Sequence, residues 1–190
     1  AGSIYISEGT YSSSFPTTTG AYREEYISST GGSDVFVMRF NSSNLSLVAS
    51  TYLGGNGDDG WGYFKSTSIS IGSGIFVTFR TLSTDIPTPI NAAYPTKPGI
   101  GPDVYISCLN ADLSDQISGT YLGGSSSDLP EAIDASAGPV FIAGHTYSID
   151  LPITAGSPKT NYQETDAFAA EFDANLQNLI GLTYLEGSAD

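Results

Sequence analysis

Three segments of this chain share one pattern of hydrophobic and polar positions. Each segment opens with an aspartate and continues through a mostly apolar run. The segments are DVFVMRFN (34–41), DVYISCLN (103–110) and DAFAAEFD (166–173). In the first segment Phe36 and Met38 point to one side of an extended chain, and Val35 and Val37 point to the other. Because both sides are apolar, the pattern predicts β-strands that are covered on both faces.

Other motifs keep the same register as these segments, which indicates an internal repeat. The pentapeptide TYLGG begins at Thr51 and again at Thr120, and the variant TYLEG begins at Thr183, with spacings of 69 and 63 residues. The three apolar segments have the same two spacings. Two further sets have spacings of 71 and 65 residues: Phe15-Pro16, Ile86-Pro87 and Leu151-Pro152, and IYIS (4–7), IFVT (75–78) and VFIA (140–143). The chain therefore holds three copies of one unit.

Each unit is predicted to form four short antiparallel strands. A short polar link joins the central segment to the strand that ends in the pentapeptide, as in a hairpin. An apolar segment, such as 66–71 or 131–136, supplies the first strand, and the first copy lacks this strand. We therefore expect three, four and four strands, in units 1–63, 64–130 and 131–190.

Antiparallel four-stranded units in series, separated by glycine-rich turns, favour an all-β fold of β-propeller blades. A β-sandwich is the alternative, but it gives no reason for a repeat in register. Three blades are too few for a closed ring, since propellers have about four to eight blades. We expect either part of a larger propeller, which we favour, or a propeller that other chains complete by strand addition.

These motifs together resemble the bacterial and archaeal β-propeller repeat often called the SBBP repeat. The matching segments are IYIS, FPTTTGAY (15–22), SDVFVMRFN (33–41), ASTYLGG (49–55), DIPTPINAAY (85–94), DVYISCLN, SGTYLGG (118–124), FIAGHT (141–146), DLPITAG (150–156), TDAFAAEFD (165–173) and LTYLEG (182–187). The resemblance covers essentially the whole chain. It implies a propeller in a secreted or surface-associated protein. It implies no particular activity, because these repeats have no generally assigned one.

The charge of the chain argues against two classes of partner. The chain has 20 acidic and 6 basic residues, which gives a formal charge of −14. Such a surface repels phosphate backbones and anionic lipids, so we expect no nucleic-acid partner. We also expect no membrane insertion, since the sequence has no apolar run of about 18 residues. The acidity fits an extracellular or cell-surface protein.

The sequence GGNGDDGWG (54–62) fits the G-G-x-G-x-D-x-U-x pattern of calcium-binding β-rolls. Asp58 and Asp59 are therefore candidate calcium ligands, since carboxylates suit a hard cation. The pattern is broken in the other two copies, where only the acid persists, as Asp128 and Asp190. An aspartate that hydrogen-bonds the backbone of a turn is the better interpretation. We expect no required cofactor, with calcium as a candidate ligand.

Two further sets of acids recur. Asp34, Asp103 and Asp166 open the third strand of each unit, and we expect them to tie an inter-strand loop, because a catalytic site is normally built once. Asp85 and Asp150 precede the Ile-Pro and Leu-Pro steps, where we expect them to cap a turn.

Aromatic residues in loops and two acceptor asparagines are candidates for binding and modification. Trp61, Tyr22 and Tyr94 are candidate glycan contacts, because aromatic faces stack on sugars. Asn41 and Asn44 begin the acceptor sequences NSS and NLS, in a turn that we expect to be exposed.

Other residues that often take part in catalysis or binding have a structural interpretation in this sequence. The repeated residues Tyr52, Tyr121 and Tyr184 indicate packing within the blades. Cys108, the only cysteine, is expected to be a buried hydrophobic side chain. The only histidine, His145, gives little support for a catalytic triad or a transition-metal site.

The sequence therefore favours a non-catalytic extracellular scaffold or interaction module of a cell-surface layer, filament or adhesin. Protein partners or copies of the chain itself would complete the assembly. One alternative is a glycan-binding module, with or without calcium. A less favoured alternative is a carbohydrate-active enzyme with active residues in the loops 17–33, 88–102 or 153–165. A binding module would group aromatic side chains on one rim, whereas a scaffold would bury them between sheets.

Overall fold

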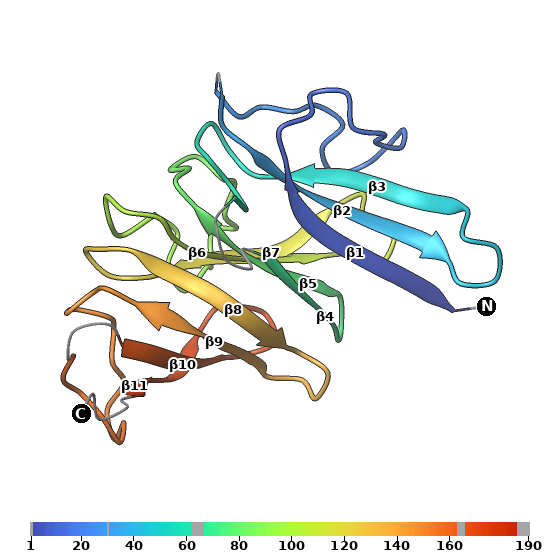
Figure 1. Ribbon diagram of the computed structural model, residues 1–190. Helices are drawn as coiled ribbons and strands as arrows, with labels where there is room; N and C mark the ends of the chain where they lie inside the picture. Colours follow the sequence, from blue (N-terminus) through green and yellow to red (C-terminus); the bar gives the residue numbers. More distant parts are fainter. Residues whose placement is uncertain (1, 30, 62–66, 163–165, 186–190) are drawn as a thin grey trace, which may run out of the picture.

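The computed structural model describes residues 2–29, 31–61, 67–162 and 166–185, and these residues form three antiparallel sheets (Figure 1). The first sheet has the order β1 (Ser3–Thr10), β2 (Asp34–Asn41), β3 (Leu47–Leu53). The second has the order β4 (Thr67–Ile71), β5 (Ile75–Thr81), β6 (Asp103–Leu109), β7 (Gln116–Leu122). The third has the order β8 (Asp128–Asp134), β9 (Val140–Thr146), β10 (Asp166–Phe172), β11 (Leu179–Leu185).

Within the described residues there are eleven strands, in sheets of three, four and four, and no helix, so these predictions are confirmed. The register also repeats. Phe36 pairs with Tyr52, Tyr105 with Tyr121, and Phe168 with Tyr184. Since the side-chain period of a strand is two, this shared register places corresponding side chains on the same face of all three sheets.

The middle sheet packs against the other two (Figure 1), and apolar residues fill both junctions. Val35, Val37 and Leu53 of the first sheet meet Val77, Phe79 and Tyr121 of the second. The opposite face of the second sheet, with Phe76, Val104, Ile106 and Leu122, meets Ile142, Phe168 and Tyr184 of the third. The middle sheet thus offers one face to the sheet before it and the other face to the sheet after it.

The central strands differ in how far they are covered. All seven residues of β6 are buried, as the pattern of apolar residues on both faces predicted. The same prediction is wrong for β10, and in β2 the outward-facing Phe36, Met38 and Phe40 are only partly buried. In β10 the residues that face the middle sheet are buried and those between them are partly or fully exposed. The reason is that β2 and β10 belong to the end sheets, each of which has a neighbouring sheet on only one face among the described residues.

The observed strands also place two unit boundaries slightly differently. The strand β8 begins at Asp128, three residues before the predicted boundary at 131. Asp59, which the sequence places in the first unit, forms an isolated β-bridge with Thr81 at the end of β5. Asp59 and Asp128 therefore already pair with the second strand of the next sheet.

Candidate functional site

The threonine and tyrosine of the repeated pentapeptide hold loops of their own unit. The Oγ1 atom of each threonine accepts a hydrogen bond from one loop amide and donates to the carbonyl of the same residue. The pairs are Thr51 with Arg23, Thr120 with Tyr94 and Thr183 with Lys159, with N···O distances of 2.9, 2.9 and 3.2 Å. Because this bond recurs in all three copies, its role is to hold the loop of each unit against the last strand of that unit.

The tyrosine of each pentapeptide is buried, and its hydroxyl group forms hydrogen bonds to the segment that leads into the Phe-Pro, Ile-Pro or Leu-Pro step. The hydroxyl groups of Tyr52, Tyr121 and Tyr184 donate to the carbonyls of Ser12, Ser83 and Ser148, at 2.6, 3.2 and 2.9 Å. The same hydroxyl groups accept the amides of Phe15, Ile86 and Leu151. This confirms that these tyrosines pack within each unit. It also satisfies a hydroxyl group that would otherwise be costly to bury.

The aspartate after the pentapeptide joins one unit to the next. The Oδ2 atom of Asp59 accepts the amide of Gly55 and the hydroxyl of Ser83, both at 2.7 Å, and its Oδ1 atom accepts the hydroxyl of Thr81. Asp128 repeats these bonds with Gly124, Ser148 and Thr146. The interpretation of a turn aspartate that binds the local backbone is confirmed for both residues. Asp190 lies outside the described residues.

The serine and threonine partners of these aspartates were not singled out from the sequence, although a signal exists. The tripeptide T-x-S stands at 10–12, 81–83 and 146–148, in the register of the other motifs. In each case the serine amide donates to the threonine Oγ1, at 3.1, 2.9 and 2.9 Å. The motif is a preformed receptor for a carboxylate.

The aspartates that open the third strands tie the loops before them, as predicted. Asp34 Oδ2 accepts the amides of Ile27 and Ser28, at 2.9 and 3.4 Å. Asp103 Oδ2 accepts the amide of Gly99 at 3.0 Å and forms a buried ion pair with Lys97 at 2.9 Å. The Oδ2 atom of Asp166 lies 3.5 Å from the Nζ atom of Lys159, which lies in the loop before β10.

The first glycine of the pentapeptide separates two buried carboxyl groups. A Cβ atom on Gly54 would lie 2.7 Å from both Asp34 Oδ1 and Asp59 Oδ2. On Gly123 it would lie 2.6 Å from Asp103 Oδ1 and 2.8 Å from Asp128 Oδ2. These positions require glycine because only a residue without a side chain admits the two carboxyl groups.

Burial makes these carboxyl groups harder to ionise than an exposed aspartate, because it raises their pKa. It raises the pKa of Asp59 and of Asp103 to about 6, and the neighbouring carboxylate adds to each increase. Burial also raises the pKa of Asp34 and Asp128 above the usual value. The Oδ1 atoms of Asp34 and Asp103 are buried without a hydrogen-bond partner among the described residues. A proton on one carboxyl of each pair would supply the missing donor.

The two calcium candidates offer few free oxygen atoms. Asp58 Oδ1 accepts both the amide and the hydroxyl of Ser33, at 2.8 and 2.7 Å. The donors around Asp59 point hydrogen atoms at the oxygens that a cation would need. In the part of the chain that the structure describes, no group of three or more His, Cys, Asp or Glu residues is arranged to hold a metal ion. The local geometry thus fits a hydrogen-bonded turn better than a calcium site.

The aspartates before the prolines make a different contact from the predicted turn cap. Asp85 Oδ1 accepts the amide of Asn56 at 2.9 Å, and Asp150 Oδ1 accepts the amide of Ser125 at 2.8 Å. Both partners follow the pentapeptide of the preceding unit. These carboxylates therefore strengthen the connection between units.

The aromatic candidates separate into two environments. Tyr22 and Tyr94 are half-buried and pack against the apolar clusters between the sheets. Trp61 is 42% exposed and lies edge-on to Tyr11, which is 52% exposed, with ring centroids 6.2 Å apart. The three candidate glycan contacts are therefore not gathered into one surface.

The remaining candidates lie apart from one another. Asn41 is half-buried and Asn44 is exposed, and their side-chain oxygens accept the amides of Ser43 and Ser46. Cys108 is buried as predicted, and burial raises its pKa to about 11. His145 Nδ1 lies 3.3 Å from a carboxylate oxygen of Glu131 at the edge of the third sheet.

No protein-family model matches this chain, and no curated protein matches its sequence. No helix within the described residues is long and apolar enough to cross a membrane.

Proposed function

We propose that this chain is a non-catalytic extracellular scaffold, a segment of a β-propeller that serves in a cell-surface layer, filament or adhesin. The observation that supports this proposal is the use of the recurring polar residues. The threonines, tyrosines and aspartates with repeated bonds hold loops and adjacent units together. Residues that are saturated by such bonds serve assembly rather than turnover.

The arrangement of the sheets fits propeller blades. The sheets lie face to face, and β4 contacts β8, which are the first strands of the second and third sheets (Figure 1). In a propeller the first strands of successive blades lie nearest the axis, and contacts between first strands follow from that geometry. Among the described residues the first sheet has no strand that corresponds to β4 and β8, so the edge of β1 is a place for strand addition.

Glycan binding is the second candidate, and the exposed pair Tyr11 and Trp61 favours it. The two rings lie at 69° to each other, so they form a corner rather than a flat surface. A sugar ring would stack on one of them and meet the edge of the other.

A glycan array and a panel of polysaccharide hydrolysis assays, each with and without calcium, test the proposed function. We expect no saturable binding and no hydrolysis. Saturable binding that Trp61→Ala removes would support the glycan-binding alternative. Hydrolysis with turnover would overturn the non-catalytic assignment.

A further inference from the structure

The two junctions within the molecule are copies of one interface. At the first junction the face of the first sheet that carries Val35 meets the face of the second sheet that carries Ile75. At the second junction Val104 of the second sheet and Val140 of the third sheet take the same places. Backbone hydrogen bonds repeat as well. The amide of Tyr22 donates to the Leu113 carbonyl at 2.8 Å, and the amide of Ala93 donates to the Leu176 carbonyl at 3.0 Å. The end sheets therefore each carry one half of this interface on their outer faces.

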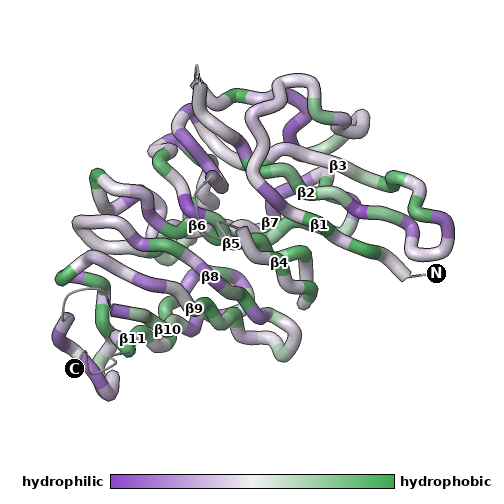
Figure 2. Tube along the Cα trace, viewed as in Figure 1, coloured by the Kyte–Doolittle hydropathy of each residue, from purple (hydrophilic) through white to green (hydrophobic). Residues whose placement is uncertain are grey.

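The outer face of the first sheet is the uncovered counterpart of a buried surface. Ile4 is 40% exposed and Ile6 is 45% exposed. The residues at the same positions of the second sheet, Ile75 and Val77, are 3% and 0% exposed. Figure 2 shows hydrophobic residues along β1 at this end of the molecule. The first sheet thus presents an apolar face of the kind that each later sheet buries.

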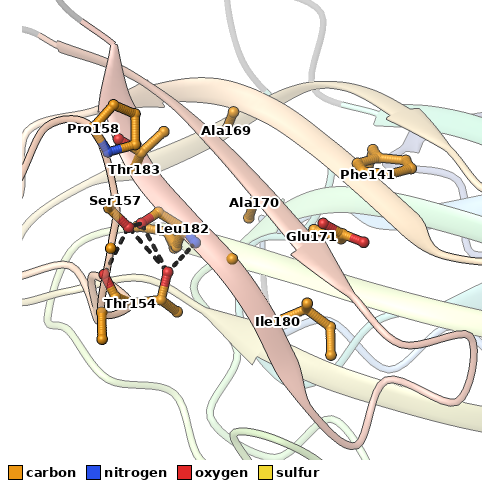
Figure 3. Close-up of a pocket in the computed structure, with 13 residues that line it drawn as sticks. Phe141, Thr154, Ser157, Pro158, Ala169, Ala170, Glu171, Ile180, Leu182 and Thr183 are labelled. Atoms are coloured by element: carbon orange, nitrogen blue, oxygen red, sulfur yellow. Dashed lines mark hydrogen bonds between the residues drawn. The ribbon is translucent and has the colours of Figure 1, made fainter.

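The outer face of the third sheet is the uncovered counterpart of the other half. Phe141 and Leu185 are each 45% exposed, whereas Phe76 and Leu122 at the same positions are 0% and 1% exposed. A hollow of about 380 Å³ lies on this face, lined in part by Phe141, Ala169 and Glu171 (Figure 3). The middle sheet has Ile106 where the third sheet has Ala169, so the smaller side chain leaves room.

The two outer faces match in size, and each also carries a glutamate, Glu8 beside Ile6 on β1 and Glu171 on β10. Met38 on the first sheet stands where Ser107 and Ala170 stand on the other two, so this face is bulkier where the third sheet is hollowed. At the first internal junction Arg39 meets Asp112 of the opposite hairpin at 3.1 Å. The third sheet has Glu171 at the position of Arg39. The corresponding hairpin of the first sheet, SSNLS (42–46), has no acidic residue that would repel it.

A second feature of the first sheet points to the same occupant. Thr10 and Ser12 form the preformed carboxylate receptor described above, yet they are only half-buried. In the other two copies the receptor is fully buried and holds the aspartate of the preceding unit. A unit with an aspartate after its pentapeptide is therefore a better occupant than an unrelated apolar surface.

We infer that a second copy of this chain docks head to tail, with its β8–β11 sheet on the β1–β3 sheet of the first. Because the two faces differ, the contact is heterologous, and it closes into a ring or continues as a filament. Two copies bring six sheets together, within the range of about four to eight blades that closes propellers. This inference rests on the proposed function as a stacked propeller segment.

Sedimentation velocity of residues 1–190 at about 1–200 µM protein tests the inference. A charge placed in either face should weaken the association between copies by roughly a hundredfold. Wild-type protein should associate as its concentration rises. Ile6→Asp and Leu185→Asp, on opposite faces, should each remain monomeric. Ile90→Asp is the control, because Ile90 is 96% exposed on the loop between β5 and β6 of the middle sheet, and it should associate as wild type does. Circular dichroism and thermal unfolding confirm that each variant is folded.

Mixing the two defective variants gives the sharper result. Ile6→Asp keeps a working third sheet and Leu185→Asp keeps a working first sheet, so the mixture should form a complex containing both. A monomeric wild-type protein, or a mixture that does not associate, would overturn the inference and leave the proposed function standing. Association of Leu185→Asp with itself would show like-to-like docking and would also overturn it. A positive glycan or hydrolysis result bears on the proposed function alone.

Discussion

The middle sheet and the two end sheets have the same repeat and different burial. In the middle sheet β6 is covered along its whole length, whereas β10 of the third sheet is covered on alternate residues. Local structure does not explain the difference, because the strand pairings repeat in register. The difference comes from the number of neighbouring sheets.

This comparison shows that one repeat does not make a complete core. Its loops are held within the unit by Tyr121 and Thr120, but its strands need apolar faces from the units before and after it. Contacts within a unit should therefore have similar energies in all copies. Contacts between sheets should depend on position in the stack.

The largest expected difference is between two isoleucines at the same repeat position. Ile75→Ala should lower the free energy of unfolding by about 2–5 kcal/mol, because Ile75 is buried between two sheets. Ile4→Ala should lower it by less than about 1 kcal/mol, because Ile4 is already partly exposed. Urea unfolding at micromolar protein concentration measures both values. Equal losses of stability in Ile75→Ala and Ile4→Ala would contradict the conclusion that a neighbouring sheet sets the contribution of this position.

A smaller effect is expected for a methyl group placed between paired carboxyl groups. Gly123→Ala should cost about 1–3 kcal/mol, because the new Cβ would press on Asp103 and Asp128. Gly181→Ala is the matched control, since a Cβ there meets no atom within 4 Å. If thermal unfolding is unchanged in both variants, the carboxyl groups do not constrain this turn.

The smallest expected effect is a dependence of stability on pH. The pKa of Asp59 and Asp103 is about 6 in the folded protein, above the ordinary value of 3.8. The folded state therefore binds more protons than the unfolded state between these values, and stability rises as pH falls from 7 towards 5. The gain should be on the order of 1 kcal/mol per group. It should shrink in Asp103→Asn, and urea titrations at several pH values measure it.

Much of the fold was predictable from the sequence, because the copies can be compared with one another. The spacing of Thr51, Thr120 and Thr183 defined the unit, and the recurrence of Asp34 and Asp103 indicated a structural role. Both inferences use positions along the chain, which a repeat supplies directly.

Contacts between units were the part that the sequence could not supply. Asp85 binds Asn56, which belongs to another unit, and no local turn pattern contains that information. Tyr22 and Tyr94 lie in loops and were expected at the surface, but those loops fold over the junctions between sheets. The one-sided burial of β2 and β10 likewise depends on which sheets are present.

The most direct test of the account compares Leu122→Ala with Leu185→Ala by urea unfolding over a range of protein concentrations. These leucines hold the same repeat position, and they are 1% and 45% exposed. Leu122→Ala should cost about 2–5 kcal/mol at every concentration. Leu185→Ala should cost less than about 1 kcal/mol at low concentration, and more as the wild-type protein associates and gains stability. Equal and concentration-independent losses would contradict the conclusion that burial in this repeat is set by its neighbours.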